Sequence, residues 1–192
     1  YEKTENIFRK KYARTVGYLD TLSDSTNLKF LYHWCSKMEK TQEYKAVMNT
    51  AADFAAHMNE GMPHRFFLDK KAEEFMCQDN QGILPVGHRS AGVKSLFFMV
   101  LDIACRMAML NPHKKENIAL SKGIVLIDEL DMHLDPIWQG KVIDALKAVF
   151  PNVQFIASTS ATALNESAKS VRMINIEHGE PVYINPKDPR KN

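Results

Sequence analysis

The stretch Gly123-Ile124-Val125-Leu126-Ile127-Asp128-Glu129 decides the fold expected for this chain. Four consecutive branched apolar residues run directly into two carboxylates. A short, uninterrupted apolar run is typical of a strand buried on both faces of a parallel sheet. In open α/β sheets, the ligand binds just beyond the carboxyl ends of such strands. We therefore expect Asp128 and Glu129 to stand at the rim of a ligand site.

The two carboxylates have the order of a Walker B motif. In that layout the first carboxylate, Asp128, supports Mg²⁺ on a bound nucleotide, and the second, Glu129, orients or activates the attacking water. A strand that ends in a solvated acidic turn would explain the same residues without any ligand. The segments before and after this strand favour the nucleotide interpretation.

Composition places the chain among ordinary globular proteins. It has 192 residues, of which 45% are hydrophobic and 25% charged, and its net charge of +2 gives no gross electrostatic footprint for nucleic acid or membrane. The three cysteines, Cys35, Cys77 and Cys105, lack metal-ligand spacing, which fits reduced thiols and a cytoplasmic protein. No apolar run approaches the ~20 residues of a membrane span. Because the chain opens with Tyr1 rather than Met, we expect it to be part of a longer protein.

Periodicity and turn signals predict three parts: a linker and helical lobe over 1–63, a core of strands and helices over 64–184, and a flexible tail over 185–192. The expected elements are helices at 28–38, 42–59, 93–110, 137–149 and 165–168, strands at 65–68, 72–77, 124–127, 153–157 and 171–176, a polar loop at 112–121, and a hairpin turn at 178–180.

The segment 87–95 nearly spells the phosphate-binding P-loop, GxxxxGK[ST]. In that loop the lysine directly follows the last glycine, whereas here Val93 separates Gly92 from Lys94. One extra residue at the start of a helix rotates every following side chain by about 100°. This disfavours the P-loop interpretation. No other P-loop occurs within residues 1–192, so a Walker A lobe must lie upstream or be absent.

An ABC-type signature, serine-x-glycine before a helix, explains the same segment better. The hydroxyl of Ser90, together with the free amides of a helix N-terminus, would make an anion site for the γ-phosphate of a nucleotide on another subunit. Gly92 belongs to the same motif. Lys94 is as well explained by a solvated helix position as by a phosphate or interface role.

With these motifs in place, the chain resembles the C-terminal half of ABC-type AAA ATPases related to RecF, SMC and OLD proteins. The resemblance is closest to the predicted ATP-binding proteins involved in virulence, a group that includes the ATPase subunits of Septu and retron anti-phage systems. The collinear segments that carry it are Leu84-Pro85-Val86, Ser90-Ala91-Gly92-Val93-Lys94, Asp102-Ile103-Ala104-Cys105-Arg106, Leu110-Asn111-Pro112, Gly123-Ile124-Val125-Leu126-Ile127-Asp128-Glu129, Leu134-Asp135-Pro136-Ile137-Trp138-Gln139 and Phe150-Pro151-Asn152-Val153-Gln154-Phe155-Ile156.

The resemblance implies an α/β fold of the P-loop NTPase type, with a mainly parallel sheet flanked by helices and an inserted helical lobe. It also implies that residues 64–184 are the C-terminal part of the ATPase core and that ATP and Mg²⁺ are bound. The residues it assigns are Asp128 to the metal, Glu129 and Ser160 to catalysis, and Ser90, Gly92, Lys94 and the D-loop aspartate Asp135 to the nucleotide.

The function implied is that of an ATPase that forms a head-to-tail dimer, or a higher oligomer, around nucleotide and controls an effector in anti-phage defence. The effector would be a nuclease, nucleic acid would be reached through the complex, and no membrane partner is implied. Two alternatives stay open: a non-hydrolysing scaffold held together by nucleotide, and a DNA-repair clamp of the RecF or SMC kind. The lack of a basic stripe or coiled coil disfavours the clamp.

The chain departs from the family pattern at two positions. Arg89 replaces the leucine that precedes the signature serine, and Ser160 replaces the switch histidine that contacts the γ-phosphate. A serine hydroxyl can form hydrogen bonds but offers no imidazole, so we expect slow hydrolysis.

Structural explanations compete for three further residues. Asp135 suits a helix N-cap as well as a D-loop, His133 suits a loop beside a subunit interface rather than a metal cluster with Asp131, and Trp138 suits the core.

Overall fold

The computed structural model describes residues 17–18, 27–58, 62–161, 171–177 and 180–183. The expected helix at 165–168 and the tail at 185–192 lie outside these residues, as do positions 178–179 of the expected turn.

The first two helices are α2 (Leu28–Met38) and α3 (Gln42–Met58), as their periodicity predicts. Asn27 caps α2, because its side-chain oxygen accepts a hydrogen bond from the backbone N–H of Phe30 at 3.0 Å. Thr41 does the same for α3 through the N–H of Tyr44 at 3.2 Å. Helix α3 then packs against α4, α5 and η3, so it lies at the centre of the described structure.

An antiparallel sheet of three strands follows: β1 (Arg65–Asp69), β2 (Glu74–Asp79) and β3 (Gly82–Pro85). Strands β1 and β2 agree with the sequence pattern, whereas β3 was not expected. The turn before β3 needs Gly82, whose φ of 130° is unfavourable for other residues. The rings of Phe66 and Phe75 pack on Phe97 of the next helix, with centroids 4.5 and 5.8 Å from it.

The signature segment joins this sheet to the long helix α4 (Ala91–Leu110) through the short 3₁₀ helix η2 (Val86–His88). A second 3₁₀ segment, η3 (Pro112–Leu120), occupies the region expected to be a polar loop. The expectation of an irregular loop was therefore wrong. Ile118, which is fully buried, anchors the segment to the core.

Strands β4 (Gly123–Ile127) and β5 (Val153–Ala157) run parallel, joined by α5 (Pro136–Val149). This is a βαβ unit, in which parallel strands need a long crossover. The expectation that the first strand is buried on both faces was wrong for the described residues. One face packs on the core, but the other leaves Ile124, Leu126 and Ile156 exposed by 67%, 70% and 52%. Side chains alternate along a strand, and no described element covers that second face.

A hairpin of β6 (Ile174–Glu177) and β7 (Glu180–Tyr183) completes the described strands, with Ile174 opposite Tyr183. The sequence placed the first of these strands three residues too early.

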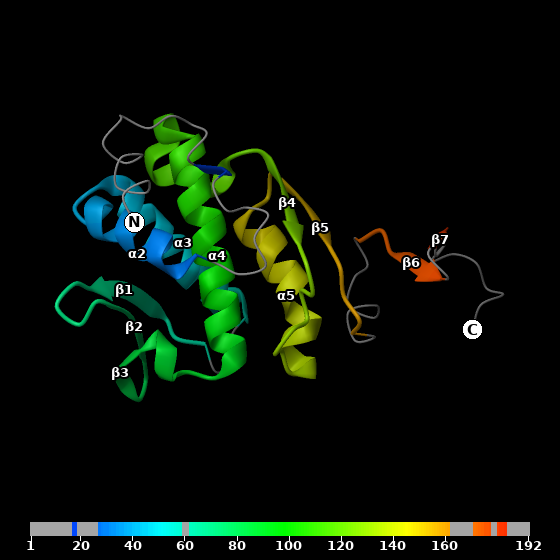
Figure 1. Cartoon of the computed structure of the whole chain (residues 1–192), viewed down its shortest axis with the longest axis horizontal. Coiled ribbons are helices and arrows are strands. Elements are labelled where there is room, and N and C mark those ends of the chain that lie inside the picture. The colour runs from blue at the N-terminus through cyan, green and yellow to red at the C-terminus, as the bar shows by residue number, and fades with distance from the viewer. Residues whose placement is uncertain (1–16, 19–26, 59–61, 162–170, 178–179, 184–192) are drawn as a thin grey trace.

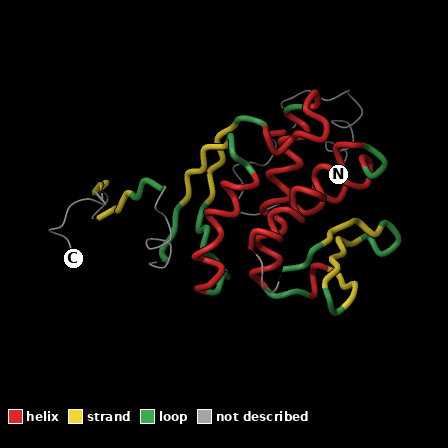
Figure 2. Tube along the Cα trace, turned by 180° about the vertical axis from the view of Figure 1, so that it is seen from behind, coloured by secondary structure: helices red, strands yellow, loops and turns green. Residues whose placement is uncertain are grey.

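In Figures 1 and 2, α2 and the β1–β3 sheet lie on one side of the structure and β4 with β5 on the other, and α3 contacts both α4 and α5. One hydrophobic cluster runs from α2 to α5, so the helical lobe and the following residues share a core. The boundary expected at residue 63 is therefore not marked by separate cores and stays a prediction. Cys35, Cys77 and Cys105 are free and buried. No described helix is long and apolar enough to cross a membrane.

Candidate functional site

The two parallel strands end side by side, and their ends are joined through Ser158. The Ser158 hydroxyl donates a hydrogen bond to Oδ1 of Asp128 and accepts one from the backbone N–H of Glu129 at 2.8 Å. The backbone groups of Ser158 bind Ile127 and Leu130 at 2.9 and 3.0 Å. Both carboxylates therefore stand, exposed, at the carboxyl edge of the parallel pair, where the sequence places them.

Glu129 has an unusual backbone conformation. Its φ is 49°, in the left-handed region that costs a residue other than glycine about 1–2 kcal/mol. The hydrogen bond from its backbone N–H to the Ser158 hydroxyl helps to hold the residue there. Strained residues of this kind cluster at functional sites, because the surrounding structure must be built to keep them.

A second link between the strand ends involves Asp131. Its Oδ2 accepts a hydrogen bond from the Ser160 hydroxyl at 3.2 Å, and its Oδ1 accepts one from the Ser160 backbone N–H at 3.3 Å. The Thr159 side chain also hydrogen-bonds to this carboxylate and lowers its pKa the most, with smaller contributions from Ser160. Asp131 is therefore held in its ionised form, and the Ser160 position is fixed to the end of β4.

Gly92 is buried against the loop that follows Asp128 and Glu129. A Cβ at this position would lie 2.9 Å from the carbonyl oxygen of His133 and 3.2 Å from Cζ3 of Trp138. Only glycine fits without moving the backbone of that loop. The structure thus gives Gly92 a packing role inside the chain, while its predicted role at a nucleotide stays a prediction. Trp138 lies in the core, as expected.

Ser90 and Asp135 cap the two helices that point at this region. The Ser90 Oγ accepts from the N–H of Val93 at 3.4 Å, and Oδ1 of Asp135 accepts from the N–H of Trp138 at 3.0 Å. Both residues are exposed. The N-cap interpretation of Asp135 is confirmed, and the nucleotide roles of both residues remain predictions.

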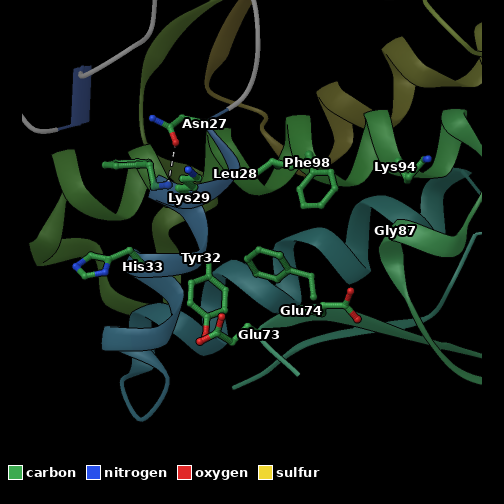
Figure 3. A pocket seen from close by; sticks show the side chains of 12 residues that line it. Asn27, Leu28, Lys29, Tyr32, His33, Glu73, Glu74, Gly87, Lys94 and Phe98 are labelled. Atoms are coloured by element: carbon green, nitrogen blue, oxygen red, sulfur yellow. Dashed lines mark hydrogen bonds between the residues drawn. The ribbon is translucent and has the colours of Figure 1, made fainter. Parts of the chain in front are cut away.

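Lys94 lies elsewhere. It stands two residues beyond Gly92, and this step turns its side chain about 200° around α4, away from the Gly92 face. There it lines an open groove of about 860 Å³ between α2, the β1–β2 turn and α4. Figure 3 shows Lys94 at one end of the groove near Gly87, with Tyr32 and Phe98 along it. The structure therefore does not bring Lys94 together with Asp128 and Glu129.

Arg89, the residue that departs from the family pattern, is bound to β2. Its Nε donates to Sγ of Cys77 at 3.2 Å, and its Nη1 forms an ion pair with Asp79 at 2.6 Å. These contacts raise the pKa of Arg89, chiefly through Cys77, and the guanidinium lowers the pKa of Asp79. The side chain thus anchors the signature segment to the three-stranded sheet instead of filling an apolar site.

The donor chemistry at Asp128 suits Mg²⁺, which binds through one or two carboxylates together with phosphate oxygens and water. The carboxylate is exposed and available, with Ser158 as its hydrogen-bond partner. Among the described residues no group of three or more His, Cys, Asp or Glu side chains could hold a metal ion.

Ser158 is a functional candidate that the sequence did not identify, and Asp131 was considered there only as part of a metal cluster, not as a partner of Ser160. The run of three hydroxyl residues at 158–160, directly after a strand parallel to the acidic strand, is the signal that could have indicated them.

No family model matches the chain. Retron Vc95 probable ATPase of Vibrio cholerae serotype O1 biovar El Tor is 40% identical over 98 residues, which cover 50% of this chain and 19% of that protein. Septu protein PtuA of Bacillus thuringiensis is 38% identical over 65 residues, which cover 33% of this chain and 16% of that protein. The chain thus spans about a fifth of the length of these relatives.

Among solved structures, one from a study of ATP-driven dimerization and DNA-stimulated activation of SMC ATPases has a TM-score of 0.54 and 18% identity. The match covers 78% of this chain and 88% of that one. It confirms the predicted fold class, an α/β fold of the P-loop ATPase type. The similarity to retron and Septu proteins confirms the resemblance inferred from the motifs.

Proposed function

We propose that this chain is part of an ATPase that binds ATP with Mg²⁺ and hydrolyses it at the carboxyl edge of β4 and β5. The observation that carries the proposal is the placement of Asp128 and Glu129 there, with both residues hydrogen-bonded to Ser158, which directly follows the neighbouring parallel strand. Similarity to proteins named probable ATPases supports it.

Each residue at this edge has a distinct task in the proposal. Asp128 holds Mg²⁺ beside the phosphates, and Glu129 accepts a proton from the attacking water or orients that water. Ser160 takes the place of the switch histidine. Hydrolysis is slow, because a serine has no imidazole with which to stabilise the charge that develops in the transition state.

The chain acts in an assembly. Ser90 and the N-terminus of the 20-residue helix α4 are available to a nucleotide held by a second subunit in a head-to-tail dimer or higher oligomer. From the similarity to retron and Septu proteins, we propose that the ATPase controls a partner, and that this partner is a nuclease that acts as the effector in anti-phage defence.

The test is steady-state ATP hydrolysis by the full-length protein and its Glu129→Gln variant. We expect the variant to keep ATP affinity and to lose 10²-fold or more in turnover, roughly the range for general acid–base catalysis. Glu116→Gln, which changes an exposed glutamate of η3, is the matched control and should leave the rate unchanged.

Equal turnover in wild type and Glu129→Gln would contradict the role of Glu129. Nucleotide-dependent assembly with no turnover in the wild type would instead favour the non-hydrolysing scaffold.

A further inference from the structure

We infer that Asp131 is a positioning residue that turns Ser160 into a hydrogen-bond acceptor for the attacking water. The inference rests on the ATPase function proposed above and assigns a role within that site. Ser160 stands where the family has its switch histidine, and a serine there would otherwise be expected to donate a hydrogen bond to the γ-phosphate. The inference makes Ser160 an acceptor instead.

The direction of the Ser160 hydrogen bond carries the inference. A hydroxyl has one hydrogen and two acceptor lone pairs, and an ionised carboxylate can only accept. The hydroxyl of Ser160 lies 3.2 Å from Oδ2 of Asp131, so its single hydrogen is committed to that carboxylate. What Ser160 can still offer to a neighbouring molecule is its lone pairs.

The backbone supports the same arrangement. The N–H of Ser160 binds the other carboxylate oxygen of Asp131 at 3.3 Å, so that one carboxylate fixes both polar groups of this residue. Thr159 binds the same carboxylate and favours its charged form by lowering its pKa. Ser160 is exposed, at the end of the strand beside Asp128 and Glu129.

In the reaction, a bond forms between the water oxygen and the γ-phosphorus, and the bond from that phosphorus to the β,γ-bridging oxygen breaks. The electron pair of the broken bond stays on the bridging oxygen of the departing ADP, and the proton lost by water goes to Glu129. The Ser160 oxygen accepts a hydrogen bond from the second hydrogen of the same water and so fixes its direction of attack.

The two possible roles of Ser160 predict opposite results for Asp131→Ala. If Ser160 orients water, the loss of Asp131 frees the hydroxyl to rotate, and the single-turnover rate falls by about 10–10²-fold with ATP affinity unchanged. If Ser160 donates to phosphate, the loss of Asp131 releases that donor, and the rate or the affinity for ATP rises.

The experiment measures single-turnover hydrolysis and ATP affinity for the full-length protein and for Asp131→Ala, Ser160→Ala and the double variant. We expect the two single variants to have similar rates and the double variant to lose nothing more, because the two residues act as one unit. Asp131→Asn, whose amide oxygen still accepts the hydroxyl hydrogen, should recover part of the rate.

Thr159→Val is the matched control, because it removes a different hydrogen bond to Asp131 and leaves both Ser160 contacts in place. A loss in Thr159→Val as large as in Asp131→Ala would overturn the inference, as would a higher rate in Asp131→Ala or additive losses in the double variant. If Asp131→Ala does not fold, Ser160→Ala and Asp131→Asn still distinguish the two roles of Ser160. Ser160→Ala should fold because Ser160 is exposed. A wild type that does not hydrolyse ATP would remove the proposed function itself, whereas a hydrolysing wild type with unchanged variants would remove only the role of Asp131.

Discussion

The β1–β3 sheet and the β4–β5 sheet differ in how the charges beside them are paired. In the β1–β3 sheet, Arg89 and Asp79 neutralise one another, and their side chains are only 14% and 20% exposed. At the end of β4, Asp128, Glu129 and Asp131 gather with hydroxyl groups, and none of the ion pairs between described residues includes them. The Asp79 carboxylate thus has a cationic partner inside the protein, whereas the end of β4 presents negative charge that a cation such as Mg²⁺ would balance.

The backbone shows the same contrast. The β1–β3 sheet packs on α4 through stacked aromatic rings, which is the ordinary way to build a core. The β4–β5 region keeps Glu129 and His133 at φ values of 49° and 64°, and it leaves the outer face of its strands exposed. The β1–β3 sheet has its own left-handed residue, Glu73 with a φ of 56°, and exposed apolar residues in β3, Ile83 and Leu84. The backbone difference therefore lies in position, because only Glu129 places its strain among the carboxylates at a strand end.

The largest effect on the free energy of unfolding is expected where the N-terminus of α4 contacts the loop that contains His133. Gly92→Ala places a Cβ 2.9 Å from the carbonyl oxygen of His133, a backbone atom that cannot rotate away. Overpacking of this kind costs about 1–3 kcal/mol, to be measured as the free energy of unfolding in urea. The matched control is Gly140→Ala in α5, where a Cβ meets nothing within 4 Å and a small gain is expected. A Gly92→Ala protein as stable as the wild type would show that the loop is not held against α4.

A smaller, pH-dependent effect is expected in the β1–β3 sheet. Because Arg89 lowers the pKa of Asp79 below its ordinary value of 3.8, the ionised pair adds stability that is fully present above that value and is lost as the pH falls through the lower, folded-state pKa. Asp79→Asn should therefore unfold at lower urea than wild type at pH 7, and the difference should shrink at strongly acidic pH. A difference that does not change with pH would mean that charge is not the reason.

Most of the helical architecture could be predicted from the sequence, because local signals define it. Apolar spacing located α2 and α3, and Asp135 caps α5 as its position in the sequence indicates. The position of Asp128 and Glu129 followed from the length of the apolar run before them. These features depend on residues that are close together in the chain.

What the sequence could not show depends on distant residues. Whether Ile124 and Leu126 are covered depends on which elements pack against β4, and the apolar run is the same in either case. The contacts of Ser158 with Asp128 and of Ser160 with Asp131 join residues about 30 positions apart, and only the parallel register of β4 and β5 brings them together. The side of α4 that Lys94 faces could not be predicted for a related reason, since a motif match does not define it, and the role of Lys94 at a nucleotide stays a prediction.

The smallest effect expected is a gain in stability from removing a residue of the proposed site. Glu129 pays about 1–2 kcal/mol for its left-handed backbone, and glycine removes that cost while adding about 0.5–1 kcal/mol of chain entropy lost on folding. Glu129→Gly should therefore raise the free energy of unfolding by up to roughly 1.5 kcal/mol, the largest difference between these two terms. Glu129→Ala, which keeps the left-handed strain, should show no such gain, although both variants should lose ATP hydrolysis. Equal stability of the two variants would mean that the Ser158 hydrogen bonds, rather than the residue type at 129, set the energy of this turn, and the contrast between the two sheets would then rest on charge alone.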